Sequence, residues 1–193
     1  MIIGITGGTG SGKTTLLNLM AEAGVMILDC DAIYHELLQT DPSLPAAIEN
    51  RFPGTVENGV LQRKKLGSMV FADQAALQEL NTITHGAIRA EILRRLENHS
   101  GHAAIDAVAL IESGMASLCD VTVAVNAPED IRLRRLMERD CISEEYARSR
   151  ICAQPTPAWY RQQCDHTLEN DGTKADFHRK CLAFLQELGI MDA

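Results

Sequence analysis

The sequence predicts an α/β fold in which a parallel sheet carries two helical insertions at its ligand-binding edge. Three observations support this prediction. Short apolar runs alternate with segments of helical periodicity, and a glycine-rich loop joins the first run to the first helix. Strand patterns then stop between about residues 36 and 98. A chain of 193 residues can bury a core of this kind without disulfides or structural metal.

The first predicted strand, residues 2 to 6, leads into a loop that satisfies the pattern G-x-x-x-x-G-K-[ST]. In such a P-loop, glycines let backbone N–H groups turn around phosphates, the lysine reaches the β and γ phosphates, and the next hydroxyl binds Mg²⁺. Helical spacing over about residues 13 to 23 supplies the helix that the motif requires. We therefore expect a nucleotide site formed by Gly7, Gly8, Thr9, Gly10, Ser11, Gly12, Lys13, Thr14 and Thr15, with Thr14 as the Mg²⁺ ligand.

A second buried strand is expected at residues 25 to 28, followed by a helix at 32 to 39. Asp29 and Asp31 come at the carboxyl end of this strand, which is the edge where parallel sheets bind ligands. One of the two carboxylates could simply cap the helix. Because both follow a strand beside the phosphate loop, we predict that at least one is functional.

Residues 36 to 98 are expected to form a helical insertion, with helices at 61 to 71 and 77 to 96. Its basic residues, Arg63 and Arg89 among them, could be solvated surface or anion ligands, and the residue pattern alone favours surface.

The remaining strands are expected at residues 103 to 111, 121 to 125 and 165 to 169, with Glu112 at the carboxyl end of the first. Between the last two lies a basic helix opened by Pro128, then a helix capped by Ser143, and then a break at Pro155 to Pro157. The arginines of the basic helix could be a solvated face, but near a phosphate site they favour a lid that neutralises transferring charge. A final helix with an apolar face is expected to pack on the sheet.

Composition narrows the class of ligand. The net charge of −8 argues against general binding to nucleic acid or to an anionic membrane, so a small ligand is expected. Six cysteines without a C-x-x-C pair indicate buried free thiols in a reducing compartment. The first apolar run is too short for a signal peptide or a membrane span, so we expect a cytoplasmic protein.

The companion motifs of GTP-dependent switches, D-x-x-G and N-K-x-D, are absent from the sequence. An acid pair, a helical insertion and an arginine lid together indicate a small-molecule kinase that uses ATP and Mg²⁺.

The motif series resembles the dephospho-CoA kinase family over nearly the whole chain. The matching residues are the loop from Gly7 to Thr15, Asp29 and Asp31, Leu61-Gln62-Arg63, Leu80-Asn81 with His85, Glu112, Arg135, Arg139-Asp140, Gln154, and Asn170 with Gly172. This resemblance implies transfer of the ATP γ-phosphoryl group to the ribose 3′-hydroxyl of dephospho-CoA, the last step of CoA biosynthesis. Two alternatives stay open: a kinase for another small hydroxyl acceptor, and a non-catalytic ATP-binding module.

The resemblance also implies roles for individual residues. Asp31 would be the base or acceptor-orienting group, acting with Lys13 and Arg139, and Arg135, Arg139 and Asn170 would contact ATP. The substrate side would include Asp29, Asp31, Arg63, His85 and Glu112. By this analogy residues 1–35, 99–128 and 163–193 form the nucleotide-binding core, 36–98 the CoA-binding domain and 129–162 the lid. We expect a monomer or a weak homo-oligomer.

Overall fold

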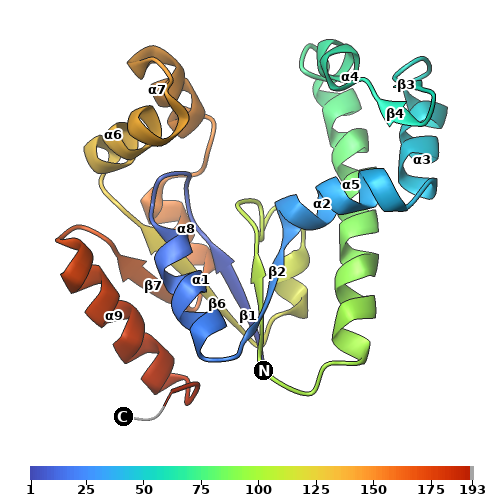
Figure 1. Cartoon of the computed structure of the whole chain (residues 1–193). Coiled ribbons are helices and arrows are strands. Elements are labelled where there is room, and N and C mark those ends of the chain that lie inside the picture. Colours follow the sequence, from blue (N-terminus) through green and yellow to red (C-terminus); the bar gives the residue numbers. More distant parts are fainter. Residues whose placement is uncertain (192–193) are drawn as a thin grey trace. The chain divides into compact units, whose positions relative to one another are not determined.

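A computed structural model describes residues 1–191 of the chain and contains a five-stranded sheet (Figure 1). The strand order is β2-β5-β1-β6-β7, and β1 pairs in parallel with β5 and β6, as β6 does with β7. The strands are β1 (Ile2–Thr6), β2 (Met26–Asp29), β5 (Ala103–Asp106), β6 (Val121–Asn126) and β7 (His166–Glu169). The predicted α/β class with a parallel sheet is therefore confirmed.

One face of the sheet is covered by α1 (Lys13–Glu22) and α9 (Lys174–Glu187). Successive side chains of a strand point to opposite faces, so Ile3 and Ile5 of β1 lie on the same side. Both are fully buried in a cluster with Leu16 of α1 and Phe184 of α9. This apolar layer fixes α1, and with it the glycine loop that precedes α1, on the sheet.

The opposite face is covered by residues that follow β5 and by α8 (Pro157–Gln163). A side chain at Gly4 would meet Leu110 and Cys119 at 2.7 Å, so these residues pack closely on the backbone of β1. The buried Asn126 donates a hydrogen bond from Nδ2 to the carbonyl of Pro157 at 3.3 Å, which ties the start of α8 to the end of β6.

Two further helices, α6 (Glu129–Asp140) and α7 (Glu144–Cys152), pack against each other and share a small apolar cluster that includes Leu136 and Ile151. The Ser143 hydroxyl caps α7 by accepting from the Tyr146 N–H, as the sequence predicted.

The structure divides into two compact units, one of residues 1–28 and 101–193 and the other of residues 29–100. The second unit is built around the long helix α5 (Gln74–Glu97), against which α2 (Cys30–Thr40), α3 (Ser43–Arg51) and α4 (Arg63–Val70) pack. Arg95 of α5 bridges Glu36 of α2 at 2.8 Å and Glu91 of its own helix at 2.7 Å. These arginine contacts help to hold the pKa of Glu91 at about 2, with the Arg94 hydrogen bond as the largest cause.

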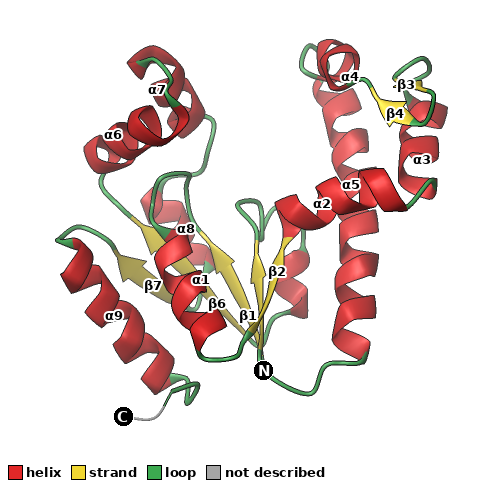
Figure 2. Cartoon of the chain, in the orientation of Figure 1, coloured by secondary structure: helices red, strands yellow, loops and turns green. Residues whose placement is uncertain are grey.

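Three expectations about local structure are wrong at least in part, and a fourth, the break at Pro155 to Pro157, is correct but incomplete. The helical insertion also contains a short hairpin, β3 (Val56–Glu57) with β4 (Val60–Leu61), whose turn places Asn58 and Gly59 at positive φ (Figure 2). The strand expected at residues 103 to 111 ends at Asp106, because the following residues turn away, so Glu112 does not follow its end directly. Pro157 begins a helix rather than only breaking one, since Thr156 caps α8. All six cysteines are free, but Cys141 and Cys152 are exposed.

No helix in the described part of the chain is both long and apolar enough to cross a membrane.

The hydrogen bonds of Asp165 at the start of β7 lead to a prediction about stability. Its carboxylate accepts from the N–H of Thr122 at 2.8 Å and from the Thr122 hydroxyl at 2.7 Å, and these bonds lower its pKa. Because this carboxylate is exposed and screened by solvent, Asp165→Asn should reduce the free energy of unfolding by only about 0.5–1 kcal/mol at pH 7, measured by urea denaturation.

The loss of stability in Asp165→Asn should depend on pH. A lowered pKa in the folded state means that the stabilisation is complete above the unfolded-state pKa near 3.8 and is lost as the pH falls through the lower folded-state value. The difference between wild type and Asp165→Asn should shrink over that range, and the exposed Glu187→Gln serves as the matched control. An equal difference at pH 7 and at pH 2 would contradict this account.

Candidate functional site

The loop between β1 and α1 has a backbone that only glycine adopts readily. Gly7, Gly10 and Gly12 have φ values of 130°, 77° and 104°, in the region that other residues rarely enter. Space is limited as well, since a side chain at Gly7 would lie 2.1 Å from the carbonyl oxygen of Val125. The glycines of the motif are therefore required by this backbone.

The carbonyl groups of the loop are held by side chains from other elements. Asn170, which follows β7 and is 3% exposed, donates from Nδ2 to the Ser11 carbonyl at 2.7 Å. Arg135 of α6 donates to the carbonyls of Gly10 and Ser11, both at 3.2 Å, and to the Asn170 side chain at 3.3 Å. These donors fix the loop through the carbonyl groups of Gly10 and Ser11.

Two side chains of the loop fit a phosphate ligand. The Ser11 hydroxyl is buried and has no hydrogen-bond partner among the described residues, so a bound group could satisfy it. Lys13 begins α1 and donates from Nζ to the Gly7 carbonyl at 2.8 Å, so its charge lies along the loop. Thr14, the expected Mg²⁺ ligand, is exposed in the first turn of the same helix.

The arginines of α6 make different contacts, although Arg132, Arg135 and Arg139 share one face of the helix at spacings of three and four. Arg132 and Arg135 contact the glycine loop, whereas Arg139 is 60% exposed and pairs with Asp140 at 2.7 Å. Asp140 also accepts from Arg150 of α7 at 2.6 Å, and hydrogen bonds from the two arginines, led by Arg139, lower its pKa to about 2. Arg139 is therefore held at the α6–α7 hairpin and does not contact the loop in this structure.

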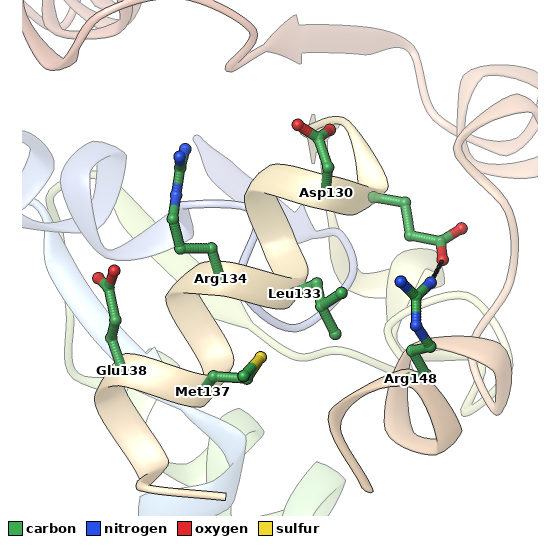
Figure 3. Close-up of a pocket in the computed structure, with 7 residues that line it drawn as sticks. Asp130, Leu133, Arg134, Met137, Glu138 and Arg148 are labelled. Atoms are coloured by element: carbon green, nitrogen blue, oxygen red, sulfur yellow. Dashed lines mark hydrogen bonds and ion pairs between the residues drawn. The ribbon is translucent and has the colours of Figure 1, made fainter. Parts of the chain in front are cut away.

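The other face of α6 forms a groove together with α7 (Figure 3). Leu133 and Met137 are its apolar residues, Arg134 and Glu138 extend beside them, and Arg148 of α7 pairs with Glu129 at 3.1 Å. The groove lies on the side of α6 away from Arg132 and Arg135, since Arg134 is two positions from Arg132 on the helix. It is therefore separate from the phosphate loop.

The unit that contains the loop carries two more acids that are candidates for the site. Asp106 is the last residue of β5 and is in register with Ile5 of β1, one residue before the end of the strand that leads into the loop. Glu112 is exposed, and its carboxylate acts with burial to raise the pKa of the Tyr160 phenol to about 12, burial being the larger cause. Both acids therefore belong to the same unit as the loop.

The two acids at the end of β2 and the start of α2 have different structural roles. The Asp29 carboxylate caps α2 by accepting from the N–H groups of Asp31 and Ala32 at 2.9 and 3.0 Å. Asp31 lies in the first turn of α2 and is exposed. Of the pair, Asp29 is thus engaged in the fold and Asp31 presents its carboxylate to solvent.

Arg63 contacts a histidine that the sequence patterns did not single out. Its Nη2 lies 3.0 Å from Nδ1 of His35, and since a guanidinium can only donate, His35 accepts through Nδ1. His35 follows Asp31 by four residues on α2, so the two share one face of the helix. His85, the other predicted substrate contact in this unit, is half-buried on α5.

Sequence patterns missed three residues of the candidate site. Arg132 contacts the glycine loop, Asp106 ends the strand next to β1, and His35 contacts Arg63. The spacing of four between Asp31 and His35 was a usable signal for the last. Nothing local could show which arginine of a basic helix is buried against a loop more than a hundred residues earlier.

Comparison with known proteins identifies the family. The family model for dephospho-CoA kinase matches residues 1–176. A dephospho-CoA kinase from Geobacillus kaustophilus is 36% identical over 100% of this chain and 98% of its own, and one from Latilactobacillus sakei is 35% identical over 89% and 87%.

Solved structures agree with the sequence relatives. A crystal structure from Thermus thermophilus covers 97% of both chains with a TM-score of 0.82 and 32% identity. A dephospho-CoA kinase from Campylobacter jejuni covers 98% of both with a TM-score of 0.70 and 25% identity. Shikimate kinase from Bacteroides thetaiotaomicron, 18% identical over 99% of both chains with a TM-score of 0.56, shares the fold alone. The resemblance expected from the motifs is confirmed: this chain belongs to the dephospho-CoA kinase family.

Proposed function

We propose that this protein transfers the γ-phosphoryl group of ATP to the ribose 3′-hydroxyl of dephospho-CoA, giving CoA and ADP. The observation that carries the proposal is the fixed glycine loop: Arg135 and Asn170 hold its carbonyls, Lys13 lies along it, and the buried Ser11 hydroxyl is left for a ligand. Family membership supplies the acceptor, which a phosphate loop alone does not specify.

On the nucleotide side, residues Gly7 to Thr15 would surround the phosphates. Lys13 would move its ammonium from the Gly7 carbonyl to the β and γ phosphates, where it offsets the charge that spreads over the transferring group. The Ser11 hydroxyl is a further donor for that site. Arg135 and Asn170 support the loop that binds ATP, a role that adds to their expected contacts with the nucleotide itself.

Mg²⁺ fits the hydroxyl and carboxylate groups at this sheet edge. Thr14 is the expected ligand, and Asp106 is a second candidate because it ends the strand next to β1. When bound, Mg²⁺ would supply positive charge that neutralises part of the phosphate charge.

On the acceptor side, Asp31 is the proposed base. Its carboxylate is exposed, whereas that of Asp29 accepts two backbone hydrogen bonds as a helix cap and so positions α2. A carboxylate that accepts the proton of the 3′-hydroxyl makes the oxygen a better nucleophile as the phosphoryl group transfers. Arg63, His85 and Glu112 are the other proposed substrate contacts, and His35 joins them through its hydrogen bond to Arg63.

The assignment of separate functions to segments of the chain is also a proposal. We assign residues 1–35, 99–128 and 163–193 to nucleotide binding, 36–98 to dephospho-CoA and 129–162 to a lid that brings Arg139 to the phosphates. Arg139 pairs with Asp140 in this structure, so that role requires a rearrangement of the side chain. We further propose a cytoplasmic enzyme that works as a monomer or weak homo-oligomer.

The direct test of the function is ADP release in the presence of Mg-ATP and a panel of acceptors. We expect release that depends on dephospho-CoA and is much faster than with nucleosides, nucleotides or shikimate. Fast release with one of the other acceptors would show a kinase of different specificity. ATP binding without release for any acceptor would show a non-catalytic module, and either result would overturn the proposal.

Asp31→Asn tests the acceptor base. Asparagine cannot take up the proton, so kcat should fall about 10²- to 10⁴-fold while the Kd for ADP stays near the wild-type value. Steady-state kinetics and ADP titration measure the two quantities. Asp41→Asn, at the other end of α2, is the matched control, and turnover of Asp31→Asn at the control's rate would remove Asp31 from the mechanism.

Lys13→Ala tests the phosphate site. Removal of the ammonium should lower kcat/KM for ATP by about 10³-fold or more, because its charge acts on the transferring phosphate. Lys174→Ala removes an exposed lysine from the start of α9 and serves as the comparison. If both variants had the same kcat/KM, Lys13 would have no role in phosphoryl transfer.

A further inference from the structure

Arg132 of α6 is a buried cation that the proposed mechanism does not use. It is 4% exposed, an unusual position for an arginine, and burial lowers its pKa, opposed by the Tyr160 phenol and then by Glu129. A guanidinium in this position is costly unless its donors are engaged. Its contacts therefore indicate what it does.

Three hydrogen bonds connect Arg132, Thr9 and Gln154. Arg132 donates from Nε to the Thr9 carbonyl at 2.9 Å and from Nη2 to Oε1 of Gln154 at 2.8 Å. The Thr9 N–H donates to the same Oε1, also at 2.8 Å. Both backbone groups of Thr9, at the tip of the loop, are thus held by side chains from α6 and from the segment after α7.

Gly8 gives an independent view of the same contact. The three atoms nearest to a side chain built at Gly8 all belong to the Arg132 guanidinium, the closest at 2.3 Å. The φ of Gly8 is not in the left-handed region, so its backbone alone does not demand glycine. A larger residue at this position would require the Arg132 guanidinium to move from its place against the loop.

We infer that Arg132 and Gln154 are positioning residues that hold the tip of the phosphate loop in its binding conformation before the nucleotide arrives. A loop fixed in advance loses less conformational freedom when phosphates bind, so the benefit appears as nucleotide affinity. The planar guanidinium is needed because it donates in two fixed directions, which a lysine ammonium cannot reproduce. This inference deepens the proposed function at its nucleotide side and does not depend on which acceptor is used.

The first test measures the Kd for Mg-ADP by calorimetry, with no acceptor present. Arg132→Met and Gln154→Met should each weaken binding roughly 10-fold or more, since a buried bond to a charged group is lost. Arg132→Lys should fail to restore affinity, whereas Gln154→Glu should restore it, because a carboxylate can still accept both hydrogen bonds. Arg134→Met removes a charge from the groove face of the same helix and should bind as wild type does (Figure 3).

The second test is a double-mutant cycle at the contact itself. Gly8→Ala should weaken Mg-ADP binding in the wild-type background, because its methyl group displaces the guanidinium and breaks the two hydrogen bonds that Arg132 donates. In the Arg132→Met background the same change should cost much less, so the two effects should not add. Thermal unfolding would reveal whether Arg132→Met folds. If it does not, the Mg-ADP affinities of Gln154→Met and Gln154→Glu alone test the inference.

Steady-state kinetics separates positioning from general damage to the fold. The KM for ATP should rise in Arg132→Met and Gln154→Met while the KM for dephospho-CoA stays within about twofold of wild type. Wild-type Mg-ADP affinity in Arg132→Lys, additive effects in the cycle, or equal rises in both KM values would each overturn the inference. Because the ADP titrations contain no acceptor, they remain decisive even if the dephospho-CoA assay fails.

Discussion

The structure of the phosphate site depends on how the carbonyl groups of one glycine loop are held. A loop with three glycines at positive φ has little intrinsic preference for a single conformation, and its order must come from outside. The buried amide of Asn170 and the guanidinium of Arg135 supply that order through the Ser11 carbonyl. Since Asn170 follows β7 and Arg135 belongs to α6, the loop's shape depends on the sheet and the helical hairpin together.

This constraint explains why elements far apart in sequence are needed for one small site. The β6–β7 pairing positions Asn170, and the start of α6 after β6 positions Arg135. On α6, the loop-facing arginines are separated from the groove that contains Arg134, although all belong to one basic stretch. A high density of arginine therefore serves two surfaces, and only one of them concerns the phosphates.

The sequence predicted the features that are governed by local chemistry. The glycine pattern, the strand before it, the apolar faces of α1 and α9 and the Ser143 cap each depend on residues close together in the chain, and all appear in the structure. The third strand was overextended because its alanines carry little β preference, so that only tertiary packing sets its end at Asp106. The burial of Arg132 and the capping role of Asp29 could be seen only in the structure. Arginine and aspartate are both common on solvated surfaces, so the residue type alone does not indicate either role.

Phosphoryl transfer to one ribose hydroxyl is the central claim, and identification of the product tests it most directly. Phosphorus NMR of the reaction of this protein with Mg-ATP and dephospho-CoA resolves phosphomonoester from phosphodiester signals. Our account predicts one new phosphomonoester on the ribose 3′-oxygen, formed in equal amount with ADP. ADP that accumulates with inorganic phosphate, or a phosphate on any other oxygen of the acceptor, would contradict it.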